Sequence, residues 1–495
     1  MDILIKGALA ITINDQNDII EYADVAIKGD RIVFVGQSRD WDEGAFEKVI
    51  HAERMILIPG LINSHTHSTQ NFLRGMFQGL PLEIWRQYYR AALRTYNQEA
   101  LRISAMLGCI EMIRNGVTTV LDHFDSPLKI EFKGANAIIE AMIESGIRGV
   151  IAYTISDRSY EETLPIHKNE VDPDALRAMD LITSDETRSS ENALEECKKF
   201  IQAFHGFHPR IYPIIGPSAP QRCTDRLLMD VKRLARDHGL MLHTHVLETK
   251  TQEVHAQKMF NQKTLIGHLC DIGFLGPEVA IAHAIWISGE DIKILSEEGT
   301  SVIHLPVSNL KLGSGLAPLR SMLDQGVNVS VATDGAASND SQNMFEAMKL
   351  AALVHNLTYR DYDRWISSRE ALNMATVHAA KVCGLEKEIG SIEEGKLADL
   401  VLLKKDSYTW IPLNDVVNQL VYSENGRSVT TTIIGGEIVM DSGHLTHVDE
   451  SRIYAEATAL RERLNDHLRH ELKRASTLEP LLRKIYFDMT KKELE

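Results

Sequence analysis

The segment MILIPGLINSHTH, residues 55–67, runs from a nearly continuous apolar stretch into two histidines that are one residue apart. Apolar runs of this kind predict a strand that is buried on both faces, as in parallel sheets. Residues two apart on a strand point to the same side, so His65 and His67 would present both rings at one strand end. The segment therefore predicts a metal site, although a pair of hydrogen-bonded surface histidines is the alternative.

Seven further short segments rich in Val, Ile and Leu follow along the chain. They are VTTVLDHF (117–124), RGVIAYTISD (148–157), IYPIIGPSA (211–219), MLHTHVLE (241–248), VAIAHAI (279–285), SVIHLPVSN (301–309) and NVSVATDGA (328–336). Most of the stretches between them have helical periodicity, and two of these stop at Gly116 and Gly239. Eight alternations of strand and helix predict an α/β fold, a closed (β/α)8 TIM barrel.

The two ends of the chain have a different pattern. DILIKGALAITI and YADVAIKGDRIVFVG near the start, and KLADLVLLKK and VTTTIIGGEIVMDSG near the end, predict short strands with glycine turns. We expect residues 1–56 and 386–445 to form one small β-sandwich and residues 57–385 to form the barrel. Residues 446–495 are helical in pattern and could contact another subunit, while the acidic residues 159–190 form either a lid or a solvated surface loop.

Composition narrows the class of protein. The 53 Lys and Arg against 69 Asp and Glu give a formal charge of −16, which disfavours nucleic acids and anionic membranes as partners. No apolar run approaches the length of a membrane span, and the first residues do not resemble a signal peptide. The 5 cysteines are scattered and none lies in a Cys-x-x-Cys motif, which argues against a disulfide framework or a thiolate zinc site. A cytoplasmic protein is expected.

Polar residues gather at the predicted C-terminal ends of the barrel strands, where the active site of this fold lies. The candidate metal ligands are three imidazoles and one carboxylate, from His65, His67, His245 and Asp334. Such donors suit one divalent cation, which would lower the pKa of bound water towards ~7. Glu248 and His283 follow neighbouring strands and could carry protons. Singly each residue could be a packing residue or a helix cap, but together they predict a metal-dependent hydrolase.

Five segments resemble the signature segments of the amidohydrolase superfamily, namely PGLINSHTH, HVLET, IAHAIWIS, SNLKLGSGLAP and ATDGAASNDSQNMFEAMKLAALVH. They are most similar to the aminohydrolase branch of methylthioadenosine and S-adenosylhomocysteine deaminases and triazine hydrolases. The resemblance, over about residues 1–445, implies one zinc or iron(II) ion on His65, His67, His245 and Asp334. It also implies that Glu248 protonates a ring nitrogen, that His283 helps to deprotonate the attacking water, and that Asp334 passes the proton to the leaving group.

Related enzymes with two metals bridge them through a carboxylated lysine late in the fourth barrel strand. The segment IYPIIGPSA contains no lysine. One metal is therefore expected, and a ring-opening cyclic amidase is disfavoured.

The sequence departs from the resemblance where a substrate would bind. An acidic residue that holds the ribose in the nucleoside deaminases is replaced by Arg94, and a histidine after the fourth strand by Ser218. Since a site built to hydrogen-bond a sugar loses affinity without such partners, an adenosine-type substrate is doubtful. Arg94 could instead meet a carboxylate or carbonyl, or lie in solvent. Trp286 could stack on a flat ring, His304 could support the site, and further candidate substrate contacts are Trp85, Gln221, Asn309 and Ser338.

We therefore predict a metal-dependent hydrolytic deaminase that acts on a planar amino-substituted nitrogen heterocycle, such as a pterin, purine base, pyrimidine or s-triazine. A triazine-type hydrolase that releases chloride or an alkylamine is the main alternative, because it uses nearly the same ligands. A non-catalytic barrel scaffold is the alternative from another class. A homo-oligomer, a dimer or larger, is expected from the resemblance.

Overall fold

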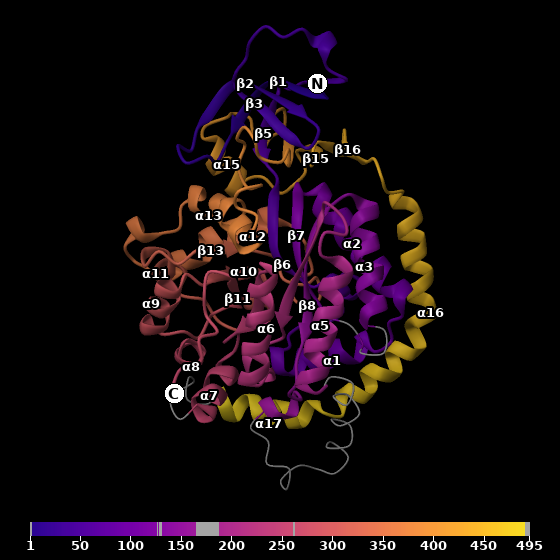
Figure 1. Ribbon diagram of the computed structural model, residues 1–495, viewed down its shortest axis with the longest axis vertical. Helices are drawn as coiled ribbons and strands as arrows, with labels where there is room; N and C mark the ends of the chain where they lie inside the picture. Colours follow the sequence, from indigo (N-terminus) through magenta and orange to yellow (C-terminus); the bar gives the residue numbers. More distant parts are fainter. Residues whose placement is uncertain (1, 126, 128–130, 165–187, 261–262, 491–495) are drawn as a thin grey trace.

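A computed structural model describes residues 2–125, 127, 131–164, 188–260 and 263–490 (Figure 1). Within them, eight strands form a parallel sheet in the order β13-β12-β11-β10-β9-β8-β7-β6. The strands are β6 (Leu61–Thr66), β7 (Val117–Phe124), β8 (Arg148–Ile155), β9 (Ile211–Pro217), β10 (Leu242–Val246), β11 (Val279–His283), β12 (Ser301–His304) and β13 (Val329–Val331). They correspond to the eight predicted segments, and the predicted barrel is confirmed.

The first and last strands of this sheet meet and close the barrel. The Asn63 side-chain amide donates to the Thr333 hydroxyl at 2.8 Å, and the backbone N–H of Thr333 donates back to Asn63 at 3.1 Å. The backbone N–H of Asp334 donates to the carbonyl of His65 at 3.1 Å. Closure therefore brings Asp334 beside the histidines of β6, although the two segments lie far apart in the sequence.

A second, mixed sheet comes from both ends of the chain and lies above the barrel in Figure 1. Its order is β17-β16-β15-β14-β5-β1-β2-β3, with β4 paired to β1. The strands are β1 (Ile3–Ile11), β2 (Ile19–Lys28), β3 (Arg31–Gln37), β4 (Lys48–His51), β5 (Met55–Pro59), β14 (Leu400–Lys404), β15 (Val429–Ile434), β16 (Glu437–Asp441) and β17 (His444–Leu445). A smaller β domain built from both termini is thus confirmed.

The predicted segment 55–67 is divided between the two sheets. The chain leaves the second sheet at Pro59 and enters the barrel at Leu61. A Cβ on Gly60 would lie 2.0 Å from the Thr118 hydroxyl, so this position needs a glycine. The two sheets are also joined by a buried ion pair, in which the Arg148 guanidinium contacts both carboxylate oxygens of Asp399 at 2.9 and 3.1 Å. This pair lies at the start of β8, so the second sheet covers the N-terminal ends of the barrel strands.

Helices surround the barrel (Figure 1). The helix α6 (Asp225–His238) begins where the Thr224 hydroxyl accepts from the N–H of Leu227 and ends at Gly239, whose φ is 64°. The other helices before the tail are α1 (Leu82–Leu93), α2 (Gln98–Arg114), α3 (Glu131–Ser145), α5 (Ser190–Phe204), α7 (Lys250–Met259), α8 (Leu265–Asp271), α9 (Gly289–Glu298), α10 (Pro306–Lys311), α11 (Leu319–Asp324), α12 (Met344–Val354), α13 (Ser368–Met374), α14 (Val377–Val382) and α15 (Val416–Tyr422).

The C-terminal tail forms α16 (Glu450–Ser476) and α17 (Glu479–Thr490). Both pack against the barrel of their own chain, and Figure 1 shows α16 along its side and α17 across its lower end. The Tyr88 hydroxyl of α1 donates to Glu479 at 2.6 Å, and Leu478 and Leu482 pack with Ile84 in one apolar cluster. The tail therefore braces α1, which is one wall of the pocket described below.

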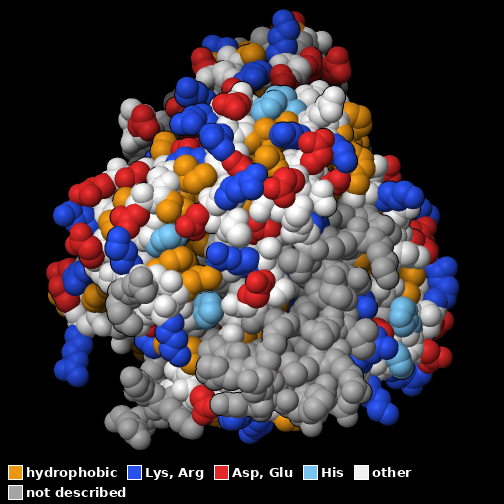
Figure 2. Space-filling model, turned by 60° about the horizontal axis from the view of Figure 1, so that its bottom comes forward, with side chains coloured by type: hydrophobic (Ala, Val, Ile, Leu, Met, Phe, Trp, Pro, Cys, Tyr) orange, Lys and Arg blue, Asp and Glu red, His pale blue; other side chains and the backbone are white. Residues whose placement is uncertain are grey.

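The sequence predictions about the acidic stretch 159–190, the surface charge and the lack of a membrane span can be compared with the structure. Of the acidic stretch 159–190, residues 165–187 lie outside the described residues. On the face seen in Figure 2, basic and acidic side chains are interspersed over the part that the structure describes. No described helix combines the length and the apolar character needed to cross a membrane.

Candidate metal and catalytic site

A pocket opens at the C-terminal ends of the barrel strands. His67 directly follows β6, His245 lies in β10, His283 ends β11, and Asp334 follows β13 after a short turn. The residues lining the pocket include His67, His123, His245, Glu248, His283 and Asp334. The site therefore lies at the strand ends where the sequence predicts it.

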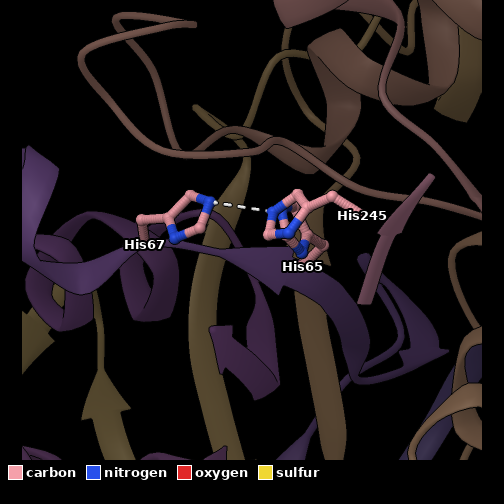
Figure 3. A group of neighbouring side chains, drawn as sticks. All are labelled: His65, His67 and His245. Carbon is pink, nitrogen blue, oxygen red and sulfur yellow. Dashed lines mark hydrogen bonds between the residues drawn. The ribbon is translucent and has the colours of Figure 1, made fainter. Parts of the chain in front are cut away.

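The four predicted metal ligands converge beneath this pocket. Figure 3 shows the ring of His67 facing those of His65 and His245, and the Nε2 atoms of His67 and His245 are 3.4 Å apart. Asp334 Oδ1 is 3.6 Å from Nε2 of His65 and 3.6 Å from Nε2 of His67. The donor atoms of the three histidines lie within 4.8 Å of one another, and those of His65, His283 and Asp334 form a second such group. One cation could contact several of these atoms at once.

Hydrogen bonds to carbonyl groups orient two of the rings. His67 Nδ1 lies 2.8 Å from the carbonyl oxygen of His123, and His245 Nδ1 lies 2.7 Å from that of Ser218. A carbonyl oxygen can only accept a hydrogen bond, so each Nδ1 carries the proton of its ring. Each Nε2 is therefore unprotonated, and its lone pair is directed at the other candidate ligand atoms. His65 differs, because its Nδ1 contacts another ring, His243 Nε2, at 3.0 Å.

The chemistry of these donors fits a cation. Nε2 of His65 is fully buried and has no hydrogen-bond partner among the described residues. Leaving such an atom unpaired costs about 1–3 kcal/mol, which coordination would offset. Burial lowers the pKa of His65 to about 4, so its ring is neutral and able to coordinate at pH 7.

The pKa values of the two carboxyl groups in the site, Asp334 and Glu248, are shifted in opposite directions. Burial would raise the pKa of Asp334, but the contact with His65 and the other imidazoles around the carboxylate hold that pKa well below 3.8. Burial raises the pKa of Glu248 well above 4.5, and the negative charges of Asp334 and Glu83 raise it further. The two pKa values are therefore shifted in opposite directions, so that Asp334 favours the ionised form and Glu248 favours the protonated form, which suits a metal ligand and a proton donor respectively.

His283 is held with one nitrogen towards the pocket. Its Nδ1 is 3.0 Å from the side-chain oxygen of Asn309, and its Nε2 is 3.6 Å from a carboxyl oxygen of Glu248. The bond to Asn309 places the proton on Nδ1 and leaves Nε2 free to accept another. His283 and Asp334 both have positive φ, 72° and 65°, a conformation that costs energy in non-glycine residues and is concentrated at functional sites.

Four of the predicted substrate contacts, Trp85, Ser218, Gln221 and Ser338, line the pocket. The indole of Trp85 stacks on the Tyr89 ring with centroids 5.2 Å apart, which makes one wall flat and aromatic. Asn309 does not line the pocket but orients His283, as described above. His304 contacts His355, with their Nε2 atoms 3.1 Å apart, rather than a metal ligand.

Two predicted substrate contacts, Arg94 and Trp286, lie elsewhere. The helix α1 ends one residue before Arg94, whose guanidinium is 3.7 Å from Glu471 of α16. The indole of Trp286 donates to the carbonyl of Ser314 at 2.9 Å and faces a separate hollow. Neither residue is among those that line this pocket, so the structure gives no support for a substrate contact at Arg94 or Trp286.

Sequence reasoning missed several residues around the pocket. Arg90 binds the carboxylate of Asp125 at 2.7 Å, and Glu83 accepts from the Thr249 hydroxyl at 2.7 Å directly beside Glu248. No local pattern marks these pairs. His243 did carry a signal, because it precedes His245 by two residues, as His65 precedes His67.

Two deaminases with known names are similar to this chain over most of its length. The chain is 35% identical over 466 residues to a 5'-deoxyadenosine deaminase of Methanosarcina mazei, covering 94% of this chain and 98% of that one. It is 37% identical over 448 residues to a 5-methylthioadenosine/S-adenosylhomocysteine deaminase of Thermococcus kodakarensis, covering 89% and 94%.

Two solved structures of enzymes superpose on this chain over almost its whole length. An adenosine deaminase from Xanthomonas campestris with bound zinc superposes with a TM-score of 0.82 at 25% identity, covering 94% of this chain and 99% of that one. An atrazine chlorohydrolase from Arthrobacter aurescens, complexed with zinc, superposes with a TM-score of 0.81 at 27% identity, covering 92% and 99%. The family model for the amidohydrolase family matches residues 56–439. The chain belongs to the amidohydrolase family.

Proposed function

We propose that this protein is a metal-dependent hydrolytic deaminase of a planar amino-substituted nitrogen heterocycle. The observation that carries the proposal is the convergence of three imidazole nitrogens and the Asp334 carboxylate beside the buried carboxyl of Glu248, at one pocket. Ligands and proton carriers arranged in this way are what hydrolysis of an amidine carbon requires.

We further propose that His65, His67, His245 and Asp334 hold one divalent cation, Zn²⁺ in the first place and Fe²⁺ as the alternative. Nitrogen and carboxylate donors suit both ions, and two related structures bind zinc. The bound cation would supply hydroxide at neutral pH by lowering the pKa of its water to about 7.

The residues of the chain would then move protons in a fixed order. Glu248 donates its proton to a ring nitrogen and makes the neighbouring carbon more electrophilic. His283 Nε2 accepts a proton from the attacking water as the carbon–oxygen bond forms. Asp334 accepts the second proton of the water and passes it to the amino group, the carbon–nitrogen bond breaks, and ammonia leaves a lactam ring. His283 then returns its proton to Glu248, 3.6 Å away, which restores both residues.

The substrate is proposed as a class: pterins, purine bases, pyrimidines or s-triazines. The stacked Trp85 and Tyr89 support a flat ring. Because Arg94 lies outside the pocket, its identity no longer argues against a ribose, and the relatives named above make 5'-deoxyadenosine a compound to test. Release of chloride or an alkylamine is the second candidate function, and the similarity to the atrazine chlorohydrolase favours it.

Ammonia release from zinc-loaded and iron-loaded protein tests the proposal. The panel contains amino-purines, 5'-deoxyadenosine, pterins, pyrimidines and triazines, and chloride and alkylamines are measured in parallel. We expect ammonia from at least one compound, and a release that is about 10³-fold slower or more from the Asp334→Asn variant. A protein that binds no stoichiometric metal and transforms no compound would be the non-catalytic scaffold instead.

We also propose a cytoplasmic homo-oligomer in which residues 57–385 form the catalytic domain and residues 1–56 and 386–445 the β domain. Among the described residues no two cysteines form a disulfide, which is typical of a reducing compartment. Sedimentation analysis of the full chain tests the oligomeric state.

A further inference from the structure

Beneath the candidate metal site, three buried imidazoles are hydrogen-bonded in a row. His65 Nδ1 is 3.0 Å from His243 Nε2, and the other nitrogen of that ring, His243 Nδ1, is 3.0 Å from His123 Nδ1. The three residues come from β6, β10 and β7 and are at most 1% exposed. The row therefore joins three strands, is buried, and reaches the pocket lining at His123.

Coordination of His65 would fix every proton in this row. A nitrogen that binds a cation has no proton, so His65 must carry its proton on Nδ1 and donate it to His243 Nε2. His243 must then carry its proton on Nδ1 and donate it to His123 Nδ1, which leaves the His123 proton on Nε2. Without a cation the opposite direction satisfies both contacts equally well.

We propose that His243 and His123 are positioning residues, which hold His65 in the orientation and tautomer of a metal ligand through a directed chain of N–H···N hydrogen bonds. The inference rests on the proposed metal site. Its mechanism is the known effect of groups behind a ligand, which fix the ring of a histidine and raise its basicity.

His123 serves two ligands at once. Its ring ends the chain that begins at His65, and its backbone carbonyl accepts from His67 Nδ1 at 2.8 Å. Space for the ring depends on Gly216 of β9, where a Cβ would lie 2.9 Å from Cε1 of His123. Packing around His123 is therefore arranged for an imidazole at this place, and a displaced ring would disturb two of the four proposed ligands.

The alternative is that the rings only fill a layer of the barrel, and substitutions separate the two explanations. His243→Leu fills the same place in the layer with an apolar side chain but leaves the His65 Nδ1–H without an acceptor. We expect it to weaken metal binding about 10- to 100-fold. His243→Gln supplies a carbonyl oxygen for His65 and an amide N–H for His123, so we expect it to recover part of the loss. The adjacent Thr244→Val is the matched control, because this buried hydroxyl has no hydrogen-bond partner among the described residues.

Zinc affinity of the full chain, measured by competition with a chromogenic chelator, gives the readout, with thermal unfolding as the check on folding. Weaker binding by His243→Leu, with Thr244→Val close to the wild type, supports the proposal. Equal affinity of His243→Leu and wild type overturns it and leaves the proposed function standing. A wild-type chain that binds no zinc would instead contradict the proposed function itself.

One measurement does not depend on the folding of a variant. Neutron diffraction from zinc-loaded wild-type crystals shows the deuterium positions directly. We expect deuterium on Nδ1 of His65, on Nδ1 of His243 and on Nε2 of His123. Deuterium on Nδ1 of His123, directed at His243, would show the opposite order and refute the chain.

Discussion

Replacement of Glu248 by glutamine tests the assignment of the proton donor. The amide has nearly the same volume but cannot transfer a proton to a ring nitrogen. Glu248 is only 5% exposed, and it lies 3.6 Å from His283, so little solvent can substitute for it. General acids of this kind contribute about 10²- to 10⁴-fold to the rate. Since each tenfold corresponds to about 1.4 kcal/mol, the variant should lose roughly 3–5 kcal/mol of transition-state stabilisation.

The direction of the pH dependence follows from the raised pKa of Glu248. The protonated form is the active one, so kcat/KM should be high below the folded-state pKa and fall as the pH rises through it. The Glu248→Gln variant should lack this alkaline limb. Stability should follow the same sign: the folded state holds a proton that the unfolded chain releases near pH 4.5, so raising the pH destabilises the wild type but not the variant.

The assay is ammonia release across pH 5–10 with the compound found in the screen, together with metal content and thermal unfolding of each protein. Glu253→Gln is the matched control, because Glu253 is a half-buried glutamate on α7 that does not line this pocket and forms an ion pair with Lys250. If Glu248→Gln retained more than a tenth of the wild-type kcat/KM, or kept the alkaline limb, Glu248 would not be the proton donor.

Four other changes have expected outcomes. Removing the metal with a chelator should abolish ammonia release, and adding zinc back should restore it. Asp334→Asn should lower both the zinc affinity, in chelator competition, and kcat/KM by about 10³-fold or more, because one residue serves as ligand and proton carrier. Arg148→Ala should cost about 3–5 kcal/mol in urea unfolding, because it leaves the buried carboxylate of Asp399 without its partner. Leu482→Ala should cost about 2–5 kcal/mol in the same assay, because this side chain is 1% exposed in the cluster that joins the tail to α1.

The barrel could be predicted from the sequence because parallel strands that are covered on both faces must be almost wholly apolar. Helix ends were also readable, since Gly116 and Gly239 adopt positive φ, 74° and 64°. The boundary inside residues 55–67 could not be read, because β5 and β6 are both buried and give one continuous apolar signal. The strand pairing and the close approach of Thr118 to Gly60 show where the chain passes from one sheet to the other.

The sequence predicts where the candidate metal ligands lie better than it predicts where the candidate substrate contacts lie. His65, His245 and Asp334 follow from topology, since all parallel strands of a barrel end at the same rim. The positions of the Arg94 and Trp286 side chains depend on the orientation of a helix or loop, and residues far along the chain determine that orientation. Glu471, which faces Arg94, belongs to the C-terminal helix, and no pattern near Arg94 announces it.

The two histidines beneath the site illustrate a further limit. His243 and His245 share one face of β10, but His245 lies at the rim and His243 one layer deeper in the barrel. A search for ligands at strand ends finds only the outer residue. The inner residue matters for a different reason: a polar side chain in a barrel core is costly unless each of its hydrogen bonds is made. The rings of His65, His243 and His123 form hydrogen bonds to one another in a row. Either end of the row can be the donor end until a cation binds Nε2 of His65. The same cation that would activate water would thus also set the direction of this row of hydrogen bonds in the barrel core.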